Sequence, residues 1–243
     1  MTRSLHAVPL ALAAILIAGN ASAQTPSVDE LVAKHLAARG GEDKLKAVNT
    51  MRLTGNVTVQ GMDMPVTVVT KRPNKMKQEM TMQGKTIMQA YDGQQVWAVN
   101  PMLGGTAPRT IDGAAADAVK NQSLFDGPLV GYKERGDALE VVGPEDVDGA
   151  KTWKLKLTRK DGKAMHIYLD AESGLEKKWS ATMEQNGLTM EIDTFITDYQ
   201  PIDGIQVART MRTLIGGQQM SLLKVDSVAF NVPVEDSEFT KPK

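Results

Sequence analysis

The feature that most constrains the fold is a block of alternating side chains between residues 71 and 101. Met76, Met80 and Met82 alternate with charged and polar residues, and a period of two indicates a β-strand with one apolar face. After a glycine-containing turn, a second strand runs back to Asp92-Gly93, a pair that is typical of tight turns, and a third strand follows over residues 95–100. The block therefore predicts consecutive antiparallel strands joined by short hairpins.

The same period recurs through much of the chain. Further period-two runs occupy residues 51–60, 65–71, 139–142, 153–158, 165–169, 175–184, 188–197, 205–215 and 220–230. The Asn186-Gly187 pair between two of these runs is a strong signal for a type I′ hairpin turn. Strands do not alternate with helices, which excludes a doubly wound α/β fold. The sequence predicts a mainly β (α+β) fold, in which one strongly curved antiparallel sheet of about eleven strands surrounds a helical plug.

Two helices are predicted ahead of the first strand, within residues 24–50. Ser27 and Glu30 form a Ser-x-x-Glu capping box that opens a helix with an apolar stripe, and Gly40-Gly41 ends it. A shorter helical turn is expected at residues 43–48.

Residues 102–136 interrupt the strand pattern. Asp112 is placed to cap a helix over residues 114–124, and Phe125 lies where that helix ends. Inserts of this kind in a strand-rich chain are more often lids or binding loops than plain connections. We expect a helical lid without strands, in which Leu124 and Phe125 cover the apolar face of the sheet.

The N-terminus predicts export. Arg3 supplies a positive charge, residues 7–18 form an apolar run, and Ala21-Ser22-Ala23 is a small-residue cleavage site. The run is shorter than the roughly 20 apolar residues that a membrane span requires. Gln24 stands where a bacterial lipoprotein carries its lipidated cysteine, and the chain has no cysteine. We expect residues 1–23 to be a signal peptide cleaved after Ala23, and the mature protein to be periplasmic, soluble and not lipid-anchored.

The composition is that of an ordinary globular chain. It has 42% hydrophobic and 23% charged residues, which suits one domain with a sizeable core over residues 24–243. The net charge of −1 gives no basic surplus for binding nucleic acid. The tail from Val232 onward carries three acids and few apolar residues, and we expect it to lie on the surface.

No catalytic or metal-binding constellation is evident in the sequence. Outside the signal there are two histidines, His35 and His166, and neither has a second ligand at the spacing of a metal site. Asp-Gly pairs begin at Asp92, Asp112, Asp126, Asp148, Asp161 and Asp203. They are explained as turns, because the pair suits that backbone geometry. The sequence therefore predicts a protein that is not an enzyme and uses no metal or cofactor.

The block at 71–101 resembles a known family. The Lys71-Arg72-Pro73-Asn74 box, the Asp92-Gly93 turn, Trp97 and Asn100-Pro101 follow the order and spacing of the core signature of the periplasmic Lol-type (LolA-like) carriers of outer-membrane lipoproteins. The resemblance implies a half-open β-barrel whose helices cover an apolar cavity. It also implies that Arg72 contacts the lid helices and helps to hold the empty cavity closed.

The candidate site combines this block with the lid. Methionine is flexible and polarizable, so the methionines of one strand face could line a pocket for varied apolar shapes; filling gaps in a core with 5% aromatic residues is the alternative. Arg72 is either a solvated cation at a strand end or, as the resemblance implies, a latch. The predicted lipid-binding and lid residues are Arg72, Met76, Met80, Met82, Trp97, Leu124 and Phe125.

Physical chemistry and the resemblance together suggest a function. Each acyl CH₂ group removed from water is worth about 0.8 kcal/mol, so a lipidated molecule does not cross an aqueous compartment unaided. The first hypothesis is a monomeric periplasmic carrier that takes lipoproteins by their acyl chains from an inner-membrane lipoprotein-releasing transporter to an outer-membrane acceptor. The alternatives are a periplasmic lipid sensor with the same fold and a carrier of another lipid.

Overall fold

The computed structural model describes residues 25–242, apart from residues 104, 125 and 186. The predicted signal peptide, residues 1–23, lies outside the described residues. The helices are α1 (Val28–Arg39), α2 (Glu42–Ala47) and α3 (Gly113–Gln122), with 3-10 turns η1 (Pro101–Leu103) and η2 (Asp236–Glu238). The N-terminal strands are β1 (Thr50–Val59), β2 (Met62–Lys71), β3 (Lys75–Met82), β4 (Lys85–Tyr91), β5 (Val96–Asn100) and β6 (Gly105–Ile111). The C-terminal strands are β7 (Ala138–Val147), β8 (Ala150–Thr158), β9 (Ala164–Asp170), β10 (Glu176–Gln185), β11 (Leu188–Ile202), β12 (Ile205–Ile215) and β13 (Gln218–Phe230).

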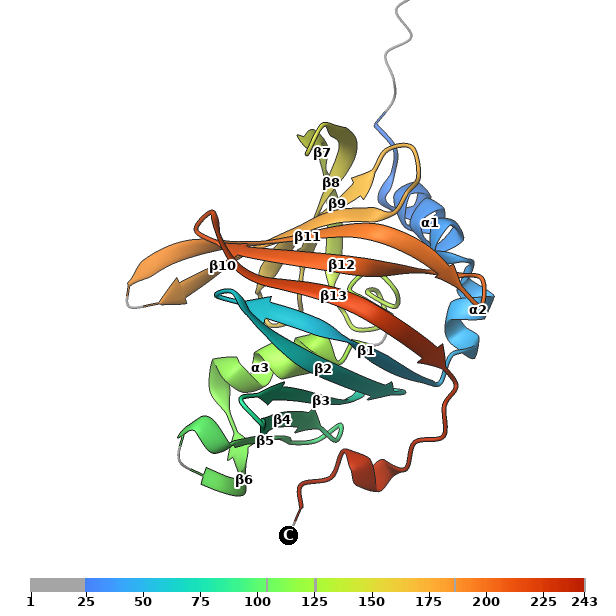
Figure 1. Ribbon diagram of the computed structural model, residues 1–243. Helices are drawn as coiled ribbons and strands as arrows, with labels where there is room; N and C mark the ends of the chain where they lie inside the picture. Colours follow the sequence, from blue (N-terminus) through green and yellow to red (C-terminus); the bar gives the residue numbers. More distant parts are fainter. Residues whose placement is uncertain (1–24, 104, 125, 186, 243) are drawn as a thin grey trace, which may run out of the picture.

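The thirteen strands of the described residues form one antiparallel sheet, in the order β6-β5-β4-β3-β2-β1-β13-β12-β11-β10-β9-β8-β7. Each half of the chain is a meander of neighbouring hairpins, and the two meanders meet where β1 pairs with β13. Strands β6 and β7 are the two edges, so the sheet is curved but unclosed (Figure 1). The predicted mainly β fold, a half-open barrel with helices, is confirmed, with thirteen strands rather than the expected eleven.

The helices cover one face of the sheet, which we call the inner face. Paired residues share a face and side chains alternate along each strand, so the register assigns each strand residue to a face. Met76 pairs with Tyr91 and packs against α3, which marks the inner face. Val69 faces the other way and packs against Phe239, which marks the outer face. In Figure 1, α1 and α2 lie at one end of the sheet and α3 at the other.

Two of the buried clusters on the inner face tie helices to the two ends of the sheet. The larger cluster joins α1 to the second meander through Leu31, Leu129, Tyr132, Leu155, Leu157, Ile167 and Leu169. Two of its members, Leu129 and Tyr132, come from the segment between α3 and β7, which therefore fills the core as well as connecting strands. The smaller cluster joins α3 to the first meander through Met76, Val96, Ala116 and Val119.

Helix α1 begins as the sequence predicts. The Glu30 N–H donates to the Ser27 hydroxyl at 3.3 Å, and the Ser27 N–H donates to the Glu30 carboxylate at 2.7 Å, which completes the capping box. Leu31 and His35 form the buried side of the helix. His35 Nδ1 lies 3.1 Å from the Gly174 carbonyl oxygen, so this nitrogen carries a proton and donates it.

His35 should make stability depend on pH. Burial lowers the pKa of His35 and Arg39 lowers it further, while Glu176, whose backbone carbonyl accepts from the Tyr199 hydroxyl, opposes the shift. The neutral ring is therefore favoured in the folded protein. Its contribution to stability is complete above the ordinary pKa of about 6.5 and is lost as the pH falls below that value. We expect His35→Gln, which keeps an N–H donor, to flatten the decline of the unfolding free energy between about pH 7 and pH 5.

Urea denaturation of both proteins across this range checks the prediction. The pKa of His166 is also lowered, mainly by burial, but His166 is present in both proteins and its contribution cancels. Parallel pH profiles for wild type and His35→Gln would contradict the prediction.

The predicted strand-free insert contains a strand. Residues 105–111 form β6, which pairs with β5 at the edge of the sheet. The strand was missed because its small and polar residues show no clear alternation and it contains Pro108, which only an edge strand tolerates. The predicted helix follows as α3, with Asp112 at its N-cap position, although the Asp112 side chain makes no capping hydrogen bond.

The expectation that the tail from Val232 onward lies on the surface is wrong, because part of this tail is buried against the sheet. Residues 231–242, which we call the strap, cross the outer face below β3 to β5 in Figure 1. Phe239 is fully buried there, and its backbone carbonyl accepts a hydrogen bond from Trp97 Nε1 at 2.7 Å. Lys71 and Lys75 each form an ion pair with Asp236 at 2.8 Å. These contacts tie the strap to the first meander.

Candidate functional site

Between the two buried clusters, the inner face carries apolar side chains that remain partly exposed. The register places Leu53 opposite Val68 within the first meander, and Val57 opposite Leu223 across the junction of the two meanders. We call the following half-buried residues of this region the central strip: Leu53, Val57, Val68, Met80, Met211 and Leu223. The strip therefore offers apolar surface from five neighbouring strands to a ligand on the inner face.

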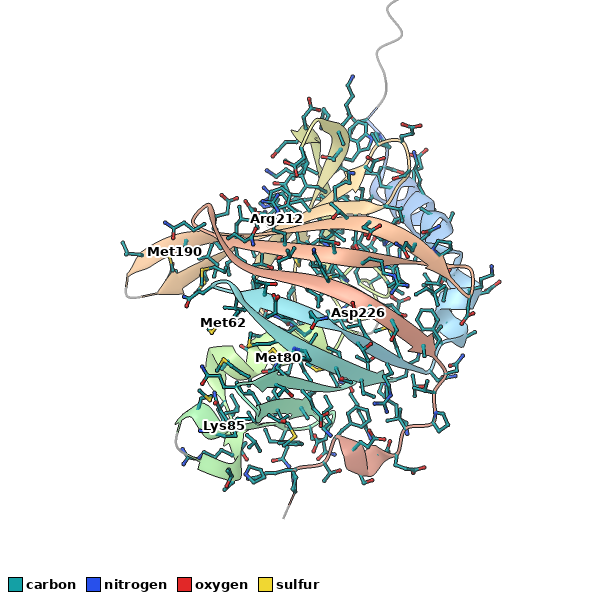
Figure 2. All side chains as sticks on the ribbon, in the orientation of Figure 1. Met62, Met80, Lys85, Met190, Arg212 and Asp226 are labelled. Atoms are coloured by element: carbon teal, nitrogen blue, oxygen red, sulfur yellow. The ribbon has the colours of Figure 1, made fainter. Side chains whose placement is uncertain are left out.

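Methionine is concentrated on this face. The register places there Met51, Met62, Met64, Met76, Met80, Met82, Met165, Met183, Met190 and Met211. The cluster predicted from the sequence comprises Met76, Met80 and Met82 of one strand, and the structure adds, among others, four methionines from the second meander. Figure 2 shows Met62, Met80 and Met190 on the same side of the molecule. Unbranched thioether side chains can adapt to apolar ligands of different shapes.

Helix α3, the predicted lid, covers one end of this surface. Its buried residues Ala116 and Val119 pack on Met76 and Val96. Its polar side reaches the turn between β8 and β9, where Lys163 Nζ lies 2.8 Å from the Asp117 carboxylate. This ion pair lowers the pKa of Asp117. Because the pair is exposed, it holds α3 only weakly across the opening between the two meanders.

The Arg72 side chain connects three segments: the end of β2, the end of α2 and the turn that follows α3. Its Nε donates to the Val48 carbonyl at 2.6 Å and its Nη2 to the Leu45 carbonyl at 2.8 Å, both at the end of α2. Its two terminal nitrogens also donate to the two carboxylate oxygens of Asp126, at 2.6 and 2.7 Å. The Arg72 side chain is 27% exposed and that of Asp126 is 14% exposed, so this bidentate pair is largely shielded from water.

Three solved structures share this architecture. A DUF1329 family protein from Desulfovibrio piger is 14% identical, with a TM-score of 0.63 over 89% of this chain and 98% of that chain. A LolA superfamily protein from Nitrosomonas europaea is 12% identical, with a TM-score of 0.60 over 89% and 99% of the two chains. The chain has a LolA-like fold.

A third neighbour gives the same result. A putative outer membrane lipoprotein-sorting protein domain from Vibrio parahaemolyticus is 13% identical, with a TM-score of 0.57 over 87% of this chain and 95% of that chain. No family model and no curated protein matches the sequence. At these identities the likeness establishes the LolA-like fold alone, and the fold that the resemblance of residues 71–101 implied is thereby confirmed.

The LolA-like fold brings part of the predicted site together. Met76 is buried beneath α3, and Met80 and Met82 follow it along the inner face of β3, half-buried. Leu124 is half-buried two residues after the end of α3, while Phe125 lies outside the described residues.

Trp97 does not belong with this group, which corrects its assignment to the lipid-binding residues. It faces the outer surface, is 1% exposed and packs with Ala90 and Val99 beneath the strap. The adjacent Val96 faces the lid, so the two residues place apolar bulk on opposite sides of the sheet.

Asp126 is the site residue that the sequence analysis missed. Its Asp-Gly pair was explained as a turn, and the residue does lie in a turn, but its carboxylate also binds Arg72. The available signal was its position: it is an acid directly after the predicted lid helix, and the resemblance placed Arg72 against that lid. The contact between Arg72 and the lid segment is present, whereas its role as a latch stays a prediction.

Within the described residues, no group of three or more His, Asp or Glu side chains is arranged to hold a metal ion. In the same part of the chain, none of the helices combines the length and the apolar character that crossing a membrane requires.

Proposed function

We propose that the protein is a carrier that binds acyl chains on the inner face of its sheet. The observation that carries this proposal is the central strip, where apolar side chains of both meanders remain half-exposed inside the curved sheet. Covering this surface with an acyl chain removes apolar area of both partners from water, at about 0.8 kcal/mol for each buried CH₂ group.

The lid fits a carrier that must also release its ligand. Among the described side chains of α3, only Ala116 and Val119 are buried against the first meander, and its polar contacts to the second meander are exposed. The deformable methionines beneath it can accept a chain without a rigid fit. A lid of low local stability over a soft surface allows binding and release without unfolding of the sheet.

The compartment and the cargo follow from this carrier function together with the sequence. We propose a soluble, monomeric periplasmic protein without a catalytic, metal or cofactor site, exported by cleavage after Ala23. Its first candidate cargo is a lipoprotein, received from an inner-membrane transporter and passed to an outer-membrane acceptor. The names of two neighbours with the same fold, a LolA superfamily protein and a lipoprotein-sorting domain, support this choice. A periplasmic sensor and a carrier of another lipid are the alternatives.

The carrier function is tested with pyrenedecanol, a neutral fluorescent alcohol with an acyl-like chain. We expect wild type to bind it and Met80→Glu to weaken binding about tenfold or more, because a carboxylate in the central strip displaces two or more methylene contacts. The matched control is Thr81→Glu, which places the same charge on the next residue, exposed on the outer face. Absence of binding to wild type, or equal loss in both variants, would overturn the carrier function.

A further inference from the structure

Arg109, on the edge strand β6, is the one arginine of the described residues whose side chain forms no hydrogen bond or ion pair. The others have partners within the protein: Arg39, Arg52, Arg72, Arg135, Arg159, Arg209 and Arg212. A guanidinium offers five donors and is always charged, so it is well suited to bind an external anion.

The Arg109 guanidinium borders a hollow rather than open surface. The hollow has a volume of about 190 Å³ and is lined by Ala98, Asn100, Gly105, Ala107, Arg109 and Ile111. A Cβ atom added at Gly105 would lie 3.3 Å from Arg109 Nη2, so the guanidinium lies close over the backbone at the start of β6. Whole-ligand pockets are larger, roughly 300 Å³ or more. The hollow therefore suits one end of a ligand.

The register joins this hollow to the acyl-chain surface. Gln78, Gln89, Ala98 and Arg109 form one row across β3 to β6 on the inner face. Along β3, this row lies between Met76, which is covered by the lid, and Met80 of the central strip. The Gln89 amide donates to the Gln78 side-chain oxygen. A polar row ending in a cation thus borders the apolar surface.

A second cation lies on the same face. Lys85 begins β4, pairs with Met82 across the hairpin, and is exposed. Figure 2 shows Lys85 on the same side of the molecule as Met62 and Met80. The first meander therefore carries two cations on the inner face, Arg109 and Lys85, at different positions along the strands.

We infer that the ligand of the inner face is an anionic amphiphile, whose carboxylate or phosphate head binds Arg109 while its acyl chain lies on the central strip. This inference rests on the proposed carrier function and narrows its substrate class. A lipoprotein N-terminus, in which neutral ester and amide groups join the acyl chains, would leave the guanidinium unused. Of the cargoes considered above, Arg109 therefore favours another lipid, one with a charged head.

The test compares pyrenedecanoic acid with pyrenedecanol, which share a chain and differ in the head group. At about pH 8, where the acid is ionised, wild type should bind the acid roughly fivefold more tightly, the size expected for a well-formed exposed ion pair. Arg109→Gln should abolish this preference and leave pyrenedecanol binding unchanged. Arg109→Lys should keep part of it, because the charge remains while the bidentate geometry is lost.

Arg52→Gln is the matched control, since Arg52 lies on the outer face of β1, away from the hollow. It should keep the full preference. If wild type binds both probes equally, or if Arg109→Gln weakens both equally, the head-group site is overturned while the carrier function stands. Failure of wild type to bind pyrenedecanol would instead remove the carrier function itself.

Acetate and inorganic phosphate distinguish a head-group site from a site for free anions. The acyl chain contributes most of the affinity in our inference, so neither small anion at millimolar concentration should remove the preference for the acid beyond the effect of chloride at equal ionic strength. Specific loss of the preference in acetate or phosphate would assign the hollow to a free anion and overturn the amphiphile assignment.

Discussion

Arg72→Leu is expected to loosen the lid by roughly a hundredfold without unfolding the sheet. The substitution removes a bidentate pair with Asp126 and two bonds to the α2 carbonyls, in a region where both charged side chains are largely shielded. Hydrogen bonds to charged groups are worth about 1.5–3 kcal/mol, and 2.8 kcal/mol is about a hundredfold. Hydrogen exchange should show α3 amides exchanging faster by this factor, with exchange in β8 to β10 little changed.

Two comparisons show whether the effect comes from the ion pair. Asp126→Asn keeps the shape of the side chain but removes its charge, so it should produce a smaller increase in α3 exchange than Arg72→Leu, which also releases the carbonyls of Leu45 and Val48. Arg52→Leu, on the outer face, should leave α3 exchange unchanged. If the Arg72→Leu and Asp126→Asn effects add in the double variant, the two side chains are not coupled and the latch is refuted.

The loosened lid has a consequence for the proposed carrier. A lid that favours the closed state when empty helps to expel the ligand, because the free energy of closure is regained on release. Arg72→Leu should therefore still take up pyrenedecanol but transfer it poorly to acceptor vesicles. Transfer at the wild-type rate by a stably folded variant would return Arg72 to a purely structural role.

The contact of Arg72 with the lid segment could be anticipated from sequence, but its partner could not. The Lys71-Arg72-Pro73-Asn74 box is part of the resemblance to LolA-like carriers, and that resemblance implied that Arg72 contacts the lid. The partner, Asp126, lies in a turn formed by an Asp-Gly pair, and local turn chemistry fully accounted for that pair without any contact 54 residues away. The turn preference of the Asp-Gly pair therefore predicted the backbone conformation of Asp126 correctly, but it gave no indication of the ion pair with Arg72.

Assignment to faces required tertiary information. Period-two patterns identify strands, but the face that each residue occupies depends on what covers it. Trp97 is on the outer face because the strap covers it, and the strap's single large apolar residue, Phe239, gave little signal in an acidic tail. The inner-face methionines of the second meander join those of the first only through the pairing of β1 with β13, more than 150 residues apart in sequence.

The strap itself provides the second large effect. Phe239→Ala should lower the unfolding free energy by about 3–5 kcal/mol, because Phe239 is fully buried against Val69 and Val234 and its removal leaves a cavity in a well-packed site. Such a loss is a large part of the 5–15 kcal/mol typical of a domain. Glu235→Ala, an exposed change in the same segment, is the control and should have little effect.

Urea denaturation measures both variants, and Trp97→Phe extends the argument. That substitution keeps most of the apolar volume but removes the Nε1–H donor, so the buried Phe239 carbonyl loses its partner at a cost of about 1–3 kcal/mol. Lys71, the last residue of β2 and the neighbour of Arg72, holds the strap through its ion pair with Asp236. A detached strap should therefore also speed hydrogen exchange at the end of β2. If Phe239→Ala were no more destabilising than Glu235→Ala, the strap would be a surface tail after all, and Trp97 would be held by the sheet alone.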